Sequence, residues 1–243
     1  MNEQRVPAER PIDASVRSLC WIGGLAAWLL TAYCVGTMVQ LGVLGGQPAT
    51  AAEAFDLLQR NRIVGLLRLD LPTVLALPLY YPVFLGLYAA LRRDEPALTT
   101  LATALAFVGV TLVLATPMGL SMVPLSDKYA AAASEATRSQ LLAVGEAILA
   151  TDMWHSTAAF VGGLLAQAGA VLASVVMLRT RVFSRTTGWV GLLNHGLDLA
   201  HIALMPVLPR AGVVLMMAAG PLYLVWFPLV GWRLLRLSRA AGE

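Results

Sequence analysis

Six long apolar runs dominate the sequence and restrict the folds open to it. They cover approximately residues 18–43, 63–91, 97–120, 154–178, 187–207 and 211–235. A helix needs roughly 20 apolar residues to cross about 30 Å of hydrocarbon. Only 13% of the residues are charged and 58% are hydrophobic, whereas soluble domains carry about 25% charged residues. The pattern predicts an all-α, polytopic membrane protein with six transmembrane helices.

The runs leave room for one domain. We expect a single six-helix transmembrane domain at residues 18–237, between short tails at 1–17 and 238–243. The first run is longer than the core of a signal peptide and lacks a convincing cleavage site, so it is predicted to be a retained span. The two cysteines, Cys20 and Cys34, lie about 21 Å apart along one helix, too far for a disulfide within the chain.

Basic residues predict the orientation of the spans. Cytoplasmic segments of membrane proteins carry an excess of Lys and Arg, and an N-terminus inside places eleven of the seventeen basic residues in the cytoplasm. These eleven are Arg5, Arg10, Arg17, Arg92, Arg93, Arg179, Arg181, Arg185, Arg233, Arg236 and Arg239; the other six are Arg60, Arg62, Arg68, Lys128, Arg138 and Arg210. We therefore predict both termini in the cytoplasm. Because the basic residues are spread between apolar runs, we expect no nucleic-acid partner; membrane lipids are the expected surroundings.

Two connections on the predicted outer side are long enough to form helices. Thr50 and Glu53 fit a capping box, which predicts a short interfacial helix before the second span. The segment from about Ser134 to Ala150 carries leucine and isoleucine on one side and charge on the other. It predicts an amphipathic helix, packed on the outer face through Leu141, Leu142, Ile148 and Leu149. The pattern fits both a surface helix and a moving lid.

Proline and small residues predict local features of the spans. The second run should be kinked, because it contains Pro72, Pro78 and Pro82. Four-residue spacing should allow close helix packing at Gly162, Ala166 and Ala170. The triplets Pro78-Leu79-Tyr80 and Pro221-Leu222-Tyr223 match, as they would after an internal duplication.

Two segments resemble a known family. They are Leu125-Ser-Asp-Lys-Tyr-Ala-Ala-Ala-Ala-Ser-Glu-Ala-Thr-Arg-Ser-Gln-Leu-Leu-Ala-Val-Gly-Glu146 and Val176-Met-Leu-Arg-Thr-Arg-Val-Phe-Ser-Arg185. Together with the general sequence pattern of residues 18–237, they resemble a bacterial six-helix membrane family catalogued as domain of unknown function 4386. The resemblance implies a multi-pass protein of the bacterial cytoplasmic (inner) membrane. It implies no activity, cofactor or catalytic residue.

The fifth run contains a cluster of ionisable residues. His195, Asp198 and His201 share one face of a helix, with Asp198 between the two imidazoles. Charged side chains within a span are costly and suggest function. Three interpretations stay open. The first is hydrogen bonds that join helices, in which Asp198 and the imidazoles satisfy one another and neighbours such as Gln167, Asn194 or Thr111. The others are a proton or ligand path, and a metal or haem site with the three residues of the cluster as candidate ligands.

Four further polar residues are predicted to form an outer layer. Arg68 and Asp70 lie at the outer end of the second run, and Asp152 and His155 open the fourth. The competing interpretation is ordinary capping by the aspartates and snorkelling by Arg68. No HExxH, CxxC, P-loop or GxSxG pattern is present, so the sequence signals no soluble-enzyme chemistry.

These features favour a membrane protein with an outward-facing intramembrane polar cavity, which binds a small molecule or lipid. The first alternative is a metal- or haem-dependent intramembrane enzyme that uses His195, Asp198 and His201. The second is a structural or accessory membrane subunit. The sequence specifies no cofactor, catalytic residue or oligomeric state.

Overall fold

All six apolar runs form helices in the computed structural model, which describes residues 14–240 and contains no strand over that range. Five segments of the described chain are long and apolar enough to cross a membrane. They are Ser15–Leu44, Leu71–Leu91, Pro96–Ala131, Thr157–Arg179 and Pro209–Arg239. This indicates a multi-pass helical membrane protein, as predicted. The fifth run also forms a helix, α10, but it is not among these five.

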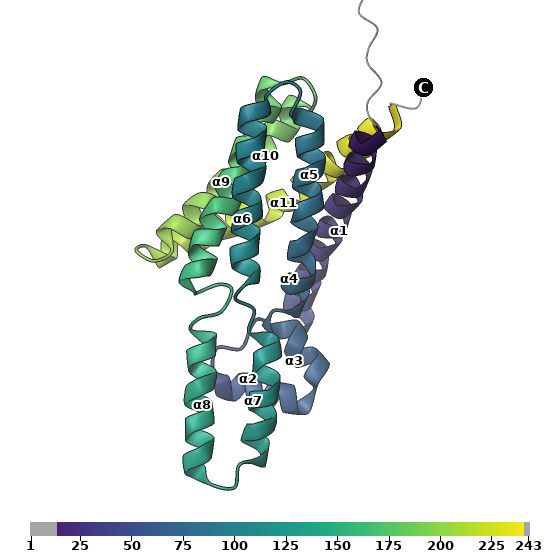
Figure 1. Ribbon diagram of the computed structural model, residues 1–243. Helices are drawn as coiled ribbons and strands as arrows, with labels where there is room; N and C mark the ends of the chain where they lie inside the picture. The colour runs from purple at the N-terminus through teal and green to yellow at the C-terminus, as the bar shows by residue number, and fades with distance from the viewer. Residues whose placement is uncertain (1–13, 241–243) are drawn as a thin grey trace, which may run out of the picture.

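The helices form two layers, which Figure 1 shows one above the other. The upper layer, the bundle, consists of α1 (Ala14–Leu44), α4 (Leu71–Ala76), the 3₁₀ helix η1 (Leu77–Leu79), α5 (Tyr80–Leu91), α6 (Pro96–Leu114), α9 (Thr157–Arg179), α10 (Arg185–Leu204) and α11 (Pro209–Ala240). The lower layer, the cap layer, consists of α2 (Ala51–Arg60), α3 (Arg62–Leu69), α7 (Gly119–Ala131) and α8 (Glu135–Leu149). Residues 14–17 and 238–240 of the predicted tails are helical; residues 1–13 and 241–243 lie outside the described chain.

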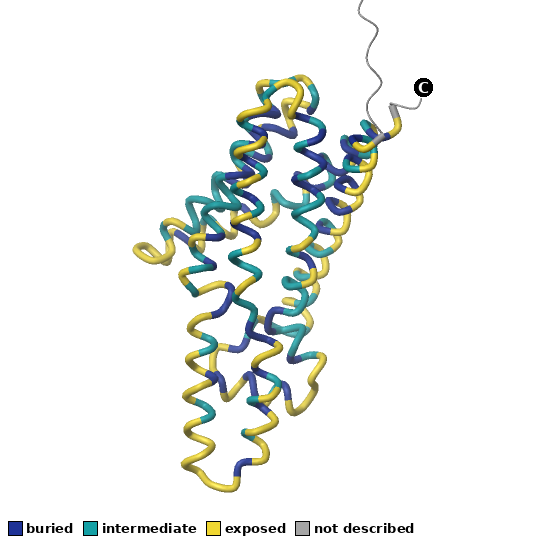
Figure 2. Tube along the Cα trace, viewed as in Figure 1, coloured by how far each residue is buried: buried dark blue, intermediate teal, exposed yellow. Residues whose placement is uncertain are grey.

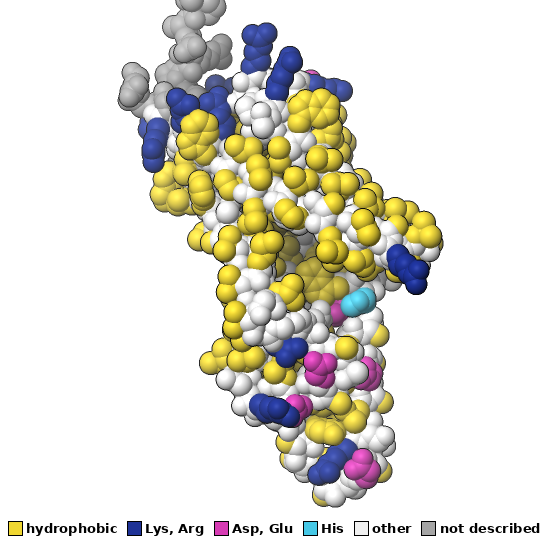
Figure 3. All heavy atoms as spheres, turned by 180° about the vertical axis from the view of Figure 1, so that it is seen from behind, with side chains coloured by type: hydrophobic (Ala, Val, Ile, Leu, Met, Phe, Trp, Pro, Cys, Tyr) yellow, Lys and Arg dark blue, Asp and Glu magenta, His cyan; other side chains and the backbone are white. Residues whose placement is uncertain are grey.

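The sides of the bundle are apolar, whereas the two ends of the molecule carry charged side chains. Figure 3 shows Lys and Arg gathered at the end of the bundle near both chain termini, which we refer to as the basic end. Acidic and basic side chains are mixed on the cap layer, and hydrophobic side chains cover most of the surface between. Large apolar residues such as Val43, Leu29 and Met217 are more than half exposed on the bundle helices. Such a surface is stable only against an apolar solvent.

Small residues bring α6 and α9 into close contact. A Cβ atom placed on Gly109 would lie 2.3 Å from the backbone nitrogen of Ala166 and 2.5 Å from the carbonyl oxygen of Gly162. The predicted close approach at Gly162 and Ala166 is therefore present, with α6 as the partner helix. Buried side chains on either side, including Ala106 and Ala170, belong to the main apolar core of the bundle.

Two predicted span boundaries are wrong. The second run is not one kinked helix, because the chain breaks at Asp70 and residues 62–69 form α3 in the cap layer. Pro72 starts α4 instead of bending it, and the predicted kink takes the form of the 3₁₀ turn around Pro78. The bundle helix formed by the third run, α6, ends at Leu114. A new helix, α7, begins at Gly119 and belongs to the cap layer.

The cap layer has a core of its own. Buried Phe55 and Leu58 of α2 pack with Met122 of α7, and Leu142 and Ile148 of α8 lie against them. The predicted capping box is formed, since Thr50 accepts a hydrogen bond from the Glu53 backbone N–H, and α8 begins at the predicted position with a Ser134 cap. However, α8 packs on α2 and α7 and extends away from the bundle, so it does not lie across the end of the bundle as expected. Figure 2 shows that both α7 and α8 are mostly exposed.

Candidate functional site

One carboxylate joins three bundle helices. Asp198 of α10 accepts two hydrogen bonds on Oδ2, one from Nε2 of Gln167 on α9 (2.7 Å) and one from the hydroxyl of Tyr223 on α11 (2.8 Å). The same Gln167 nitrogen also donates to the Tyr223 hydroxyl at 3.0 Å. All three groups lie inside apolar helices, where unpaired polar groups are costly. This arrangement therefore holds α9, α10 and α11 in register.

His195 completes what we refer to as the Asp198 cluster: Asp198, Gln167, Tyr223 and His195. Its Nδ1 lies 2.8 Å from Oε1 of Gln167. An amide oxygen only accepts hydrogen bonds, so Nδ1 is the donor and Nε2 of the neutral ring is left as an acceptor. The ring is 1% exposed and packs edge-on against Trp226, with centroids 4.4 Å apart. Nε2 has no hydrogen-bond partner among the described residues.

Of the interhelical hydrogen bonds considered for Asp198, the one to Gln167 is present, and neither imidazole is hydrogen-bonded to the carboxylate. His201 binds elsewhere: its Nδ1 lies 3.0 Å from the carbonyl oxygen of Gly212, at the start of α11. The physical reason is Gln167, whose amide offers a donor to Asp198 and an acceptor to His195 and so lies between them. Within residues 14–240, no group of three or more His, Cys, Asp or Glu is placed to hold a metal ion.

The Asp198 cluster is not fully buried. Asp198 and Tyr223 are half-buried, and so is Tyr80 of α5, which packs on Phe227 with ring centroids 5.7 Å apart. Phe227 in turn stacks on Tyr223 at 5.5 Å. Neither Asp198 Oδ1 nor the Tyr80 hydroxyl has a hydrogen-bond partner in the described chain, and neither is among the sealed polar atoms. Figure 3 shows that the rear face of the molecule is hollowed at mid-height, between the apolar bundle and the charged cap layer.

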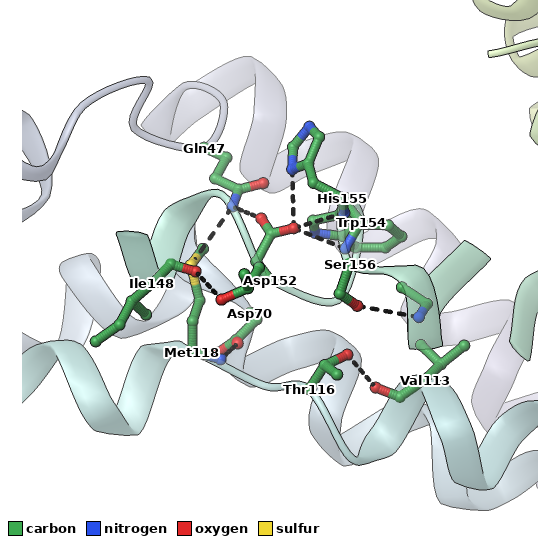
Figure 4. A network of polar contacts seen from close by, with 12 residues as sticks. Gln47, Asp70, Val113, Thr116, Met118, Ile148, Asp152, Trp154, His155 and Ser156 are labelled. Carbon is green, nitrogen blue, oxygen red and sulfur yellow. Dashed lines mark hydrogen bonds and ion pairs between the residues drawn. The ribbon is translucent and has the colours of Figure 1, made fainter. Parts of the chain in front are cut away.

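A second polar network lies where the bundle meets the cap layer (Figure 4). The carboxylate of Asp70, 2% exposed, accepts hydrogen bonds from the backbone N–H groups of Met118 and Gly119. Nε2 of Gln47 donates to Oδ2 of Asp152 at 3.0 Å and lies 4.0 Å from Sδ of Met118. The four chain crossings between the layers, at residues 45–50, 70, 115–118 and 150–156, each contribute a member to this junction network.

Asp152 organises the last of these crossings. Its side chain is 1% exposed, and Oδ1 accepts from the backbone N–H groups of Trp154 and His155, both at 2.8 Å. The same oxygen lies 2.8 Å from Nδ1 of His155, whose side chain is 67% exposed. The prediction that Asp152 and His155 open the fourth span is wrong, because α9 begins later with Ser156 as its cap.

The remaining outer-layer residues also have structural partners. Asp70 makes no side-chain cap for its own helix but caps α7 from across the junction. Arg68 does not snorkel; its Nε donates to the carbonyl oxygen of Gly46 at 2.8 Å and its Nη2 lies 3.3 Å from Glu53. Asp70, Asp152 and His155 thus all belong to the junction network, whereas Arg68 bonds to Gly46 and Glu53. The polar contacts of these four side chains therefore serve to join separate segments of the chain.

Sequence reasoning named neither Tyr223 nor Tyr80 as site residues. A signal was present, because both tyrosines end the repeated Pro-Leu-Tyr triplets and both pack on Phe227. Comparison with protein-family models, curated proteins and solved structures found no match to the chain.

Proposed function

We propose that this protein is a six-span protein of the bacterial cytoplasmic membrane that binds a small molecule or lipid in a chamber open to the outer face. The chamber is the space bordered by Asp198, Tyr223 and Tyr80. The sixth span in this proposal is α10, whose 20 residues are long enough to cross a bilayer. It packs between α9 and α11, and its inward-facing Asn194 and His195 lower its hydropathy without meeting lipid.

The open oxygen of Asp198 carries the proposal. A charged aspartate at the centre of a span costs about 2.5–3.5 kcal/mol on insertion scales. Holding three helices together uses only Oδ2, while Oδ1 is accessible and unpartnered in the described chain. A purely structural role, the competing function, would be served better by a neutral amide with both atoms engaged. An accessible acceptor inside the bundle favours a ligand.

The orientation gives a direct first test. An even number of spans places both termini on one side, and the charge distribution puts that side in the cytoplasm. Reporter fusions after Arg93, Arg185 and Glu243 should therefore report cytoplasm, and a fusion beside Lys128 should report the outside. A cytoplasmic signal at Lys128 would reverse the orientation, and with it the outward opening of the chamber.

The chamber itself can be tested with a single cysteine. In a background with Cys20 and Cys34 replaced by alanine, Tyr80→Cys should react with a charged, membrane-impermeant thiol reagent added outside intact cells. The reason is that only a thiol in contact with water forms the reactive thiolate.

Val225→Cys is the matched control for this experiment. Val225 is 46% exposed in a groove of apolar residues on the surface of α11, where the proposal places lipid. It should stay unlabelled although it is exposed. Failure of Tyr80→Cys to react from either side would mean that the chamber is closed, and reaction only after permeabilisation would mean that it opens inward.

A further inference from the structure

The chamber carboxylate has no basic counter-ion. The ion pairs of the described chain lie in the cap layer, at the junction and between Arg179 and Glu95; none includes Asp198. Within residues 14–240, every Lys and Arg lies outside the central part of the bundle helices. The two histidines of α10, His195 and His201, each lie three residues from Asp198 and direct Nδ1 to Gln167 and to the Gly212 carbonyl oxygen. Asp198 therefore forms no ion pair with a Lys, Arg or His of the described chain.

Aromatic rings and free acceptors surround this carboxylate. Tyr80 packs on Phe227, which in turn stacks on Tyr223, the partner of Asp198, and the Tyr80 hydroxyl has no hydrogen-bond partner in the described chain. The rings of Tyr223 and Phe227 border the same space. Aromatic faces attract cations, most strongly where water is excluded. A carboxylate beside tyrosine and phenylalanine rings is thus suited to a positively charged group.

Sealed polar atoms next to the chamber indicate the same excess of hydrogen-bonding capacity. Asn194 is fully buried and neither atom of its amide has a partner among the described residues; Nε2 of the buried His195 is also unpartnered. Buried polar groups of native proteins are normally satisfied. Asn194 and His195 of α10 therefore keep hydrogen-bonding capacity that residues 14–240 do not fill.

The donor set favours an organic cation over a metal ion. Ca²⁺ and Mg²⁺ take six or more oxygen ligands, and the chamber offers one free carboxylate oxygen and one free hydroxyl. An ammonium group brings three N–H donors and fits between a carboxylate and aromatic rings. We infer that the chamber selects ligands that carry an ammonium group, with Asp198 as the counter-ion. This inference rests on the proposed function and names the class of its ligand.

Such an ammonium group could belong to a soluble amine or to the headgroup of an aminophospholipid. A groove of about 490 Å³, lined mainly by apolar residues of α1 with Leu67 and Pro72, runs along the bundle surface to Tyr33. Tyr33 shares a hydrogen bond with Thr73 at 2.8 Å, and both Tyr33 and Tyr80 pack against the main apolar core of the bundle. An apolar groove on this surface suits a lipid tail, so both sources of the ammonium group are tested.

The test measures thermal unfolding of the purified full-length protein in detergent, with phenethylammonium chloride or the neutral 2-phenylethanol of similar shape. The ammonium compound should raise the midpoint of unfolding and the alcohol should not. Asp198→Asn should weaken the response to the amine about tenfold or more, since it removes a charge-assisted contact. Tyr80→Phe should weaken it by a smaller factor, and Tyr81→Phe, whose hydroxyl pairs with Thr111, should leave it unchanged.

Nanodiscs separate the two sources. If the ligand is an aminolipid, protein in phosphatidylethanolamine should unfold at a higher temperature than protein in phosphatidylglycerol and should gain nothing further from the amine. If it is a soluble amine, adding the amine should raise the midpoint of unfolding equally in both lipids. Equal stabilisation by amine and alcohol, an unchanged response in Asp198→Asn, or no response to amine or aminolipid would overturn the inference. A labelled Tyr80→Cys with no amine response would leave the chamber standing and reject only the ammonium ligand.

Discussion

Replacing Gly109 by alanine is expected to destabilise the bundle by about 3 kcal/mol, near the upper end for overpacked cores. The added methyl group would meet the backbone of Gly162 and Ala166 at 2.3–2.8 Å, and a backbone cannot move aside as a flexible side chain can. Relief requires α6 and α9 to separate, which would loosen the longest close contact in the bundle. Thermal unfolding in detergent, followed by circular dichroism, should show a clearly lower midpoint.

Two other helical glycines supply the control for this substitution. An added Cβ on Gly196 or Gly220 would meet no atom within 4 Å. At such positions alanine normally favours a helix over glycine by about 1 kcal/mol, so Gly196→Ala and Gly220→Ala should be neutral or slightly stabilising. The same chemical change would then have opposite signs at different sites. Similar midpoints for all three variants would show that α6 and α9 do not pack through Gly109.

Predictions from the sequence were correct where a single physical constraint determines the local structure. Long apolar runs predicted helices, because hydrocarbon forces backbone groups to pair within a segment, and the capping box of Thr50 and Glu53 marked the start of α2 correctly. Prediction was wrong where tertiary contacts compete with local pattern. Apolar residues 63–69 look like part of a span, but Leu69 packs in the cap-layer core and Asp70 binds the start of α7 instead of extending α4.

The same contrast between local pattern and tertiary contacts holds for the candidate site. Periodicity put His195, Asp198 and His201 on one face of a helix, and each has a protein partner from a neighbouring helix. Gln167 was among the neighbours suggested by the sequence, and it bonds to both Asp198 and His195. Tyr223 was not, because only the packing of three helices brings this residue of α11 level with the carboxylate of Asp198.

Replacing Asp70 by alanine is expected to release the cap layer from the bundle. The change would leave the buried N–H groups of Met118 and Gly119 without their acceptor at the start of α7. Hydrogen bonds to charged groups contribute about 1.5–3 kcal/mol each, so the cap layer should lose about 3 kcal/mol or more of local stability. The bundle should persist, because its core is a cluster separate from that of the cap layer.

Limited proteolysis would distinguish this local release from general unfolding. In Asp70→Ala, trypsin should cut faster after Lys128 and Arg138, which lie in α7 and α8, while sites at the basic end keep their original rates. Asp56→Ala is the matched control in the same layer, because the Asp56–Arg60 pair is 56% and 77% exposed and such surface pairs contribute roughly 0.3–0.5 kcal/mol. Its cleavage should match that of the unaltered protein. Equal cleavage of the two variants would mean that the junction network does not hold the cap layer, whereas faster cleavage at both ends of Asp70→Ala would mean that the two layers unfold as one unit.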